Sequence, residues 1–289
     1  MNVHDESARR SFWTEHMERS RALLEAMERY PVQECSEGFA SIRDAAVDDG
    51  VEMMFSETKL AGKFDRILFI RKSLIKDLLR VARDMNKRGW ILKIEDGFRT
   101  EEMQVALGRN PILFDQIVRM CLWENEGCPP SLDLIFRRAK CLVAIVPCNG
   151  THLFGAAMDI SVFGRDDGAE VWRGGPYLEM SERTPMVSPF VSAQEQENRR
   201  AITGLMERHG FMHYPGEFWH FNKGDAMAQM LTKSGKPGIY GPVHWDSATN
   251  TVTPFLNPSA PLTPPEEFQR LIESAFQRIA MKIPANIQT

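Results

Sequence analysis

The sequence predicts an α+β protein, because short segments typical of strands are interspersed with segments whose apolar residues recur at helical spacing. Residues 90–94 and 158–163 show the strand pattern, and residues 74–85 show the helical one. The chain has 289 residues, of which 43% are hydrophobic, so it is long enough to bury a full core.

The first half of the chain is expected to start with a helix and then to alternate strands and helices. The expected helices are residues 5–29, 74–85 and 111–123, and the expected strands are residues 64–70 and 90–94. Thr100 and Asn110 each precede a helical run, where their side chains are suited to cap the first turn. Pro111 is suited to the first position of the helix that follows Asn110.

The second half is expected to contain further strands, a long loop and two amphipathic helices. The expected strands are residues 141–146, 158–163 and 218–221, and residues 164–190 are expected to form a long loop at the site. Ser192 and Glu195 form a capping box, which predicts a helix that ends at Gly210. Thr263 is expected to cap a last helix, with Pro264 at its first position.

These patterns divide the chain into three segments. Residues 1–50 are expected to form a helical N-terminal extension, residues 51–225 the main domain, and residues 226–289 a C-terminal extension with an amphipathic helix. The amphipathic helices must cover apolar surface. They are therefore expected to pack on the main domain or on a second copy of the chain, which would form a homo-oligomer.

Charge and composition exclude several kinds of partner. The chain has 35 Lys and Arg against 39 Asp and Glu, and no basic block of the kind that binds nucleic acid or an anionic membrane. No apolar run approaches the length of a membrane span, and the first residues lack a signal-peptide core. Five cysteines without a CxxC pair are typical of reduced thiols. A cytoplasmic location is therefore expected.

Two histidines and one aspartate are candidates for a metal centre. A catalytic zinc site takes three protein ligands and leaves one position for water, and His152, Asp159 and His220 would supply that set. Two neutral imidazoles and one carboxylate leave a net positive centre, which lowers the pKa of bound water. A histidine seven residues before an aspartate also occurs without a metal. His209, His213 and His244 are better explained as surface, capping or structural residues.

Glu217 is a candidate base, because it lies three residues before His220 and can accept a proton from water. Residues three apart on a regular strand face opposite sides. Glu217 and His220 therefore converge only if Glu217 lies in a turn before the strand, as the preceding Pro215-Gly216 indicates. Trp219 would flank the metal as an apolar wall or pack beneath it.

Arg99 is a candidate for stabilising negative charge. By itself it is better explained as a surface arginine after a turn. Beside a metal-polarised carbonyl, its guanidinium would stabilise the oxyanion that develops in the transition state.

Together these motifs resemble the VanX-type D-alanyl-D-alanine dipeptidases, zinc peptidases of the group that also includes the D,D-carboxypeptidases and the hedgehog signalling domain. The resemblance covers residues 51–225. It rests on Lys93-Ile94-Glu95-Asp96-Gly97-Phe98-Arg99, on His152 with Gly155, Ala157 and Asp159, on Asn198-Arg199, and on Glu217-Phe218-Trp219-His220-Phe221.

The resemblance implies a small central antiparallel sheet and one Zn²⁺ per chain, held by His152, Asp159 and His220. It also implies that Glu217 is the catalytic base and that Arg99 stabilises the transition state. The implied substrate is a small dipeptide.

The resemblance and its departures also bear on substrate binding. Glu179 lies where the family keeps an aspartate near the substrate amine, and Trp219 borders the same pocket. Thr151 replaces the usual serine before the first zinc histidine, and Phe154 replaces a basic residue. These departures leave the ligands and the base in place, but they leave the preference of the pocket open.

The leading hypothesis is a zinc dipeptidase that hydrolyses D-Ala-D-Ala or a related short D-amino-acid dipeptide. One alternative is a D,D- or L,D-carboxypeptidase that acts on cell-wall peptides. Another is a catalytically inactive binding module that is stabilised by zinc.

Overall fold

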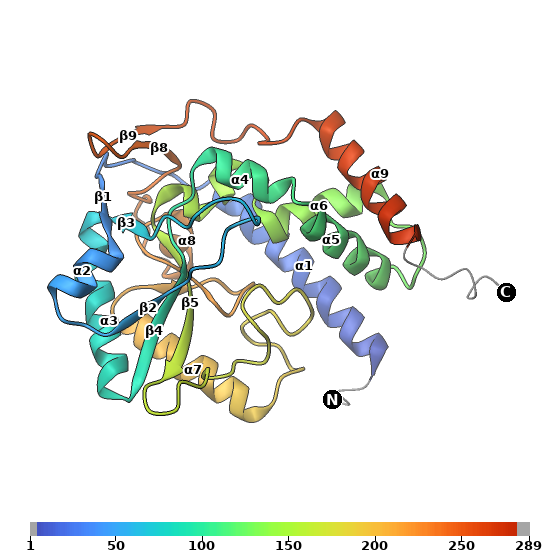
Figure 1. The fold of residues 1–289 in the computed structure, drawn as a ribbon. Helices are drawn as coiled ribbons and strands as arrows, with labels where there is room; N and C mark the ends of the chain where they lie inside the picture. The colour runs from blue at the N-terminus through green and yellow to red at the C-terminus, as the bar shows by residue number, and fades with distance from the viewer. Residues whose placement is uncertain (1–4, 282–289) are drawn as a thin grey trace.

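The computed structural model describes residues 5–281 and has the α+β class that the sequence predicts (Figure 1). Its central sheet has the strand order β2-β4-β5-β7-β6. The strands are β2 (Met53–Phe55), β4 (Trp90–Asp96), β5 (Ala157–Gly164), β6 (Met212–His213) and β7 (His220–Asn222).

One edge of the sheet differs from the expected antiparallel arrangement. The strands β4, β5, β7 and β6 pair antiparallel, but β2 runs parallel to β4, so the sheet is mixed. The chain passes from β2 to β4 through a helix, and such a crossover is what allows two strands to run parallel.

Helices surround this sheet. The α-helices are α1 (Glu6–Glu28), α2 (Ile42–Asp48), α3 (Ile75–Lys87), α4 (Glu101–Gly108), α5 (Pro111–Glu124), α6 (Leu132–Val143), α7 (Ala193–Arg208), α8 (Ala226–Leu231) and α9 (Pro265–Met281). The 3-10 turns are η1 (Lys72–Leu74), η2 (Pro147–Asn149) and η3 (Thr151–Phe154). Two small antiparallel sheets pair β1 (Phe39–Ser41) with β3 (Phe69–Arg71), and β8 (Val243–Asp246) with β9 (Thr251–Pro254).

The N-terminal helix α1 is part of the main hydrophobic core. Its residues Trp13, Met17 and Leu24 are buried in the same cluster as Leu92 of β4 and Ile160 of β5. Figure 1 shows α1 running between the sheet and the helices α5 and α6. The helix therefore contributes to the core that supports the sheet.

The C-terminal helix α9 belongs to a second core cluster. Its residues Phe268 and Ile272 pack with Phe114 and Ile117 of α5. In Figure 1, α5, α6 and α9 form one group beside the sheet. The division of the chain at residues 50 and 225 stays a prediction.

Most of the local signals in the sequence act as predicted. Thr100 caps α4 by accepting from Met103 N, and Asn110 caps α5, with Pro111 as the first helical residue. Ser192 and Glu195 form the predicted capping box of α7. The stretch from 165 to 192 contains no helix or strand, in agreement with the predicted loop.

Three predicted elements differ from the structure. Residues 141–146 were expected to form a strand, but Cys141 belongs to α6, which ends where Ala144 takes a left-handed conformation. A short apolar run looks the same in a buried strand and at the end of a buried helix, so periodicity cannot separate them. The strands expected at 64–70 and 218–221 are shorter and begin and end later in the chain, at Phe69–Arg71 and His220–Asn222.

Between residues 5 and 281, no helix has both the length and the apolar character needed to cross a membrane.

Trp13→Ala is expected to lower the free energy of unfolding by about 3–5 kcal/mol, because Trp13 is 1% exposed and the substitution leaves a cavity in the main core. Trp172→Ala is the matched control, since Trp172 is 42% exposed and should cost about 1 kcal/mol or less. Urea denaturation measures both values. Equal losses would show that α1 is not integrated in the core.

Asp225 is expected to make stability depend on pH. Its carboxyl group caps α8 and is fully buried, and burial raises its pKa from 3.8 to about 7. Between these values the folded protein keeps a proton that the unfolded chain has lost, so the contribution of Asp225 to stability falls as the pH rises. Between pH 5 and pH 8, the free energy of unfolding of the wild type should therefore fall by about 2 kcal/mol more than that of Asp225→Asn.

Thermal or urea unfolding at both pH values measures this difference. Asp65→Asn is the control, because the Asp65 side chain is 91% exposed. An identical pH profile for Asp225→Asn and wild type would contradict the prediction.

Candidate metal centre

Pairing of β5 with β7 brings Asp159 and His220 together. The two residues lie directly opposite each other in the register. Because side chains alternate along a strand, Met158 and Ile160 point into the core while Asp159 points to the opposite face. On β7, Phe221 enters the core in the same way, which leaves His220 on the face that carries Asp159.

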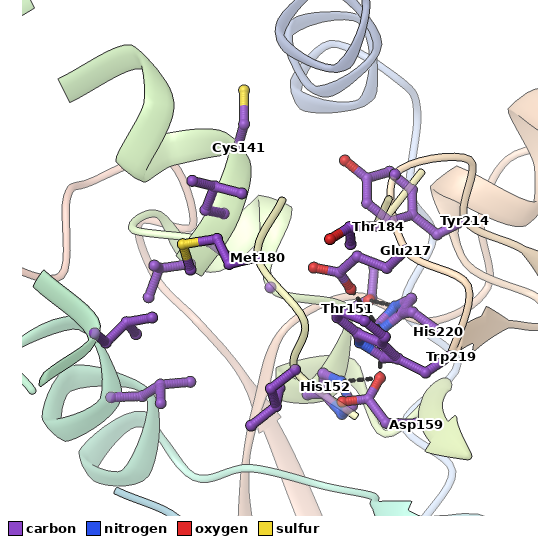
Figure 2. A pocket seen from close by; sticks show the side chains of 18 of the residues that line it. Cys141, Thr151, His152, Asp159, Met180, Thr184, Tyr214, Glu217, Trp219 and His220 are labelled. Carbon is purple, nitrogen blue, oxygen red and sulfur yellow. Dashed lines mark hydrogen bonds and ion pairs between the residues drawn. The ribbon is translucent and has the colours of Figure 1, made fainter. Parts of the chain in front are cut away.

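His152 reaches this face from the 3-10 turn η3, which immediately precedes β5. Gly155 ends the turn with a left-handed backbone angle φ of 66°. A Cβ at this position would lie 2.0 Å from the Phe39 ring. Glycine is therefore required where the chain folds back. His152, Asp159 and His220 each offer a ligand atom, and these atoms lie within 4.8 Å of one another (Figure 2).

Hydrogen bonds orient the His152 ring. Its Nδ1 lies 2.7 Å from the Gly97 carbonyl oxygen, which can only accept, so Nδ1 carries the proton. The other nitrogen, Nε2, is buried and finds no hydrogen-bond partner within the described chain. It lies 3.3 Å from Asp159 Oδ1. The Nε2 lone pair therefore faces the Asp159 carboxylate in a buried site, and a cation between them would bind both groups.

Hydrogen bonds also orient the His220 ring, but through Nε2 rather than Nδ1. Its Nε2 lies 2.9 Å from Asn222 Oδ1 and 2.9 Å from Thr151 Oγ1. When Nε2 donates to Asn222, Nδ1 presents a lone pair, 2.8 Å from Asp159 Oδ1. That contact needs either a proton or a metal ion. The donor set of two imidazole nitrogens and one carboxylate therefore fits a divalent cation.

The electrostatics of Asp159 and His152 favour ligation. Burial would raise the pKa of Asp159, but His152 and His220 outweigh it and hold that pKa well below its usual value. Burial, assisted by the Arg99 charge, lowers the pKa of His152. A charged carboxylate and a neutral imidazole are the protonation states that bind a metal. For His220, burial acts to lower the pKa, but the hydrogen bond and charge of Asp159 outweigh burial and raise it, so a metal ion would have to displace a proton from this ring.

Asp159 is also held from outside the cluster. The Tyr177 hydroxyl donates to Asp159 Oδ2 at 2.8 Å, and Arg99 Nη2 lies 3.5 Å from the same oxygen. Sequence reasoning missed Tyr177, because it lies in the irregular loop between β5 and α7, 18 residues after Asp159. No spacing rule connects a loop residue to a strand residue at that distance.

Glu217 lies in a turn before β7, which is the geometry that the sequence required. Its Oε2 lies 3.9 Å from His220 Nδ1. Burial raises the pKa of Glu217 to about 7, with the Asp159 charge adding to the effect and His220 and Arg99 opposing it. The Glu217 side chain is 23% exposed, so solvent can still reach it. A carboxyl group with this pKa can exchange protons near neutral pH.

Arg99 is buried and rigidly held rather than exposed after a turn. Its Nε donates to Asp96 Oδ2 at 2.8 Å, and its Nη1 donates to Gln104 Oε1 at 3.2 Å. Burial acts to lower its pKa, but the carboxylates of Asp96 and Asp159 outweigh burial and raise it. The guanidinium is a fixed positive charge beside the cluster.

The three predicted substrate-binding residues also border the pocket. The Thr151 hydroxyl is already bonded to His220, and Trp219 is 3% exposed, with its ring 5.8 Å from that of Tyr177. Glu179 Oε1 accepts from Ser181 Oγ at 2.6 Å. Their roles toward a substrate stay predictions.

One pocket of about 300 Å³ contains the cluster, Glu217 and Arg99. The helix α1 contributes Trp13, Met17 and Ser20 to its wall. The N-terminal helix, which sequence analysis treated as an extension, is therefore part of the site.

Two buried arginines support the strand and loop that carry the site. Arg173 donates to the carbonyl oxygens of Phe218 at 2.8 Å and Ile160 at 2.7 Å. Arg199 donates to Arg173 O at 2.7 Å and Pro185 O at 2.6 Å. Burial lowers their pKa values to about 10 and about 9. Their charges are directed at backbone carbonyls, which fixes the loop against β5 and β7.

Comparison with known proteins agrees with this site. Residues 129–234 match a family model described as D-ala-D-ala dipeptidase. A D-alanyl-D-alanine dipeptidase of Enterococcus faecium is 33% identical over 97 residues, which cover 34% of this chain and 46% of that protein. One of Synechocystis is 26% identical over 216 residues, which cover 68% of this chain and 86% of that protein. The match thus spans about half the length of the first relative.

Among solved structures, the vancomycin resistance D,D-pentapeptidase VanY from a VanB-type resistance cassette, in complex with Zn(II), is similar at 17% sequence identity and a TM-score of 0.35. The match covers 64% of this chain and 94% of that one. The family match takes in His152, Asp159, Glu217 and His220. Residues 129–234 are therefore similar to the D-alanyl-D-alanine dipeptidase family over the segment that carries the cluster and Glu217.

Proposed function

We propose that the chain is a zinc-dependent dipeptidase that hydrolyses D-Ala-D-Ala or a related short D-amino-acid dipeptide. The observation that carries the proposal is the His152, Asp159 and His220 cluster with Glu217 beside it in one pocket. The family match supports peptide hydrolysis as the chemistry of this pocket.

Zinc is the metal that the donor set favours among common divalent ions, because imidazole nitrogens and one carboxylate are typical of catalytic zinc sites. His152 would bind through Nε2 and His220 through Nδ1, which are the nitrogens left free by the hydrogen bonds to Gly97 and Asn222. When bound, the ion supplies Lewis acidity to the scissile carbonyl and to the attacking water.

Glu217 is the proposed general base. Its carboxylate faces the pocket close to His220, so it can accept a proton from the attacking water and deliver it to the leaving amine. A raised pKa keeps the proton transferable in both directions near neutral pH.

Arg99 is proposed to stabilise the negative charge that develops on the carbonyl oxygen. Asp96 and Gln104 hold its guanidinium in place, so no reorganisation is needed during the reaction. Glu179 is proposed to bind the ammonium group of the substrate, because its carboxylate lines the same pocket. Trp219 is proposed to exclude water beside the reacting atoms.

Glu217→Gln is expected to lower kcat/KM for D-Ala-D-Ala by about 100-fold or more, because the amide cannot accept the proton of the attacking water. Bound zinc should remain near one per chain, since the proposed ligands are unchanged. Ninhydrin detection of released alanine and metal analysis measure the two values. Glu197→Gln is the surface control, with the Glu197 side chain 59% exposed. A Glu217→Gln enzyme with wild-type turnover would refute the mechanism.

A blocked substrate separates the dipeptidase from a carboxypeptidase. A pocket that binds a free ammonium should reject N-acetyl-D-Ala-D-Ala, because the acetylated nitrogen cannot pair with the Glu179 carboxylate. We expect at least a tenfold lower kcat/KM for the blocked compound. Equal or faster cleavage of it would favour the carboxypeptidase.

Tyr177→Phe is expected to weaken zinc binding by about 10- to 100-fold, because it removes the hydrogen bond that orients Asp159. Competition with a chromophoric chelator measures the Kd. Tyr240→Phe is the matched control, because Tyr240 is also buried but bonds to Ser73 and Glu37, outside the cluster. Unchanged zinc affinity in Tyr177→Phe would show that Asp159 needs no outer support.

A further inference from the structure

The pocket has two chemically different sides. Polar and charged atoms of the metal centre occupy one side, and apolar side chains from three helices and the long loop occupy the other. We call this second side the apolar wall and define it as Leu107, Ile112, Leu113, Leu142, Leu178 and Met180. Figure 2 shows Met180 across the cavity from the metal-centre residues His152 and Asp159.

Leu178 is held at the pocket against two ordinary preferences. Its φ is 66, in the left-handed region where a leucine is strained and glycine or asparagine is favoured. Its side chain is also 53% exposed, so it gains little from burial in the fold. A strained residue whose side chain is not used by the core indicates a role in binding.

Ile112 is the second exposed member of the wall. It lies in the first turn of α5, where it is 72% exposed and lines the pocket. Single exposed apolar residues are common, but Ile112 and Leu178 border the same cavity as the metal centre. Exposed apolar side chains that converge on one pocket are typical of a ligand-binding surface.

The size of the pocket indicates the kind of occupant. A volume of about 300 Å³ lies at the lower end of the range for small-molecule sites, which favours a short peptide over a protein segment. The methyl groups of D-Ala-D-Ala would leave much of the apolar wall uncovered. A larger apolar side chain on the substrate would cover it and displace water from it.

We propose that the apolar wall is a subsite for a bulky apolar side chain, so that the preferred substrate is a D-amino-acid dipeptide with a large aliphatic or aromatic residue beside the scissile bond. The inference rests on the proposed function, because it takes the metal centre to be the place of cleavage. It goes further in naming the substrate class and the residues that select it.

Binding to an inactive enzyme tests the subsite apart from catalysis. Isothermal titration calorimetry of zinc-loaded Glu217→Gln should compare D-Ala-D-Ala with D-Ala-D-Leu and D-Leu-D-Ala. We expect at least one leucine dipeptide to bind about tenfold or more tightly than D-Ala-D-Ala, because its added carbons become buried. Affinity of both leucine dipeptides equal to or below that of D-Ala-D-Ala, or no measurable binding of either, would overturn the inference.

Leu178→Asn, made in the same inactive Glu217→Gln background, tests whether the apolar wall causes the preference for a leucine dipeptide over D-Ala-D-Ala. Asparagine tolerates the left-handed backbone, so the fold should be retained while the apolar surface is lost. We expect the preference for the leucine dipeptide to fall at least threefold. Val187→Asn is the matched control, because Val187 lies in the same loop, is 75% exposed and does not line the pocket. Equal losses in the two variants would contradict a role for the wall.

Turnover by the wild-type enzyme distinguishes the two proposals. Tight binding of a leucine dipeptide without cleavage of any dipeptide would refute the proposed function and keep the subsite. Cleavage of D-Ala-D-Ala without any preference for leucine in binding would refute the subsite and keep the proposed function.

Discussion

The structure of the site depends on the placement of Asp159 opposite His220 across β5 and β7. This register places the buried Asp159 carboxylate beside the rings of His152 and His220. In each ring, the nitrogen that does not face the carboxylate is already hydrogen-bonded, to Gly97 in one case and to Asn222 in the other. Buried charges and lone pairs are costly unless they are paired. A divalent cation would satisfy all three groups at once, so the register that builds the sheet also builds the candidate metal centre.

The site is rigid because its supports are buried and directed at the backbone. Arg173 and Arg199 donate to carbonyl oxygens of β5, of the loop between β5 and α7, and of the turn before β7. These bonds hold the segment that carries Tyr177 and Glu179 in place without regular secondary structure. Long irregular loops are usually mobile. Here the arginine side chains supply the hydrogen bonds to carbonyl oxygens that neighbouring strands would supply in a sheet.

The two ends of the chain contribute differently. The helix α1 enters the main core and also lines the pocket, so core packing and the shape of the site are linked through Trp13 and Met17. The helix α9 packs on α5 and supports the helices that carry much of the apolar wall. Opposite the metal centre, the chemistry of the pocket is therefore set by helices and a loop rather than by the central sheet.

The sequence by itself determined the α+β class and the caps of α4, α5 and α7, because these depend on local periodicity and capping signals. It also pointed to the residues that the structure brings together at the candidate metal centre, through motifs that resemble a known family. It did not determine the helix that ends with residues 141–143, the parallel pairing of β2, the contact of Tyr177 with Asp159, or the entry of α1 into the pocket wall. Each of these joins segments far apart in the chain or resolves an apolar run compatible with two structures, and only tertiary packing selects between such alternatives.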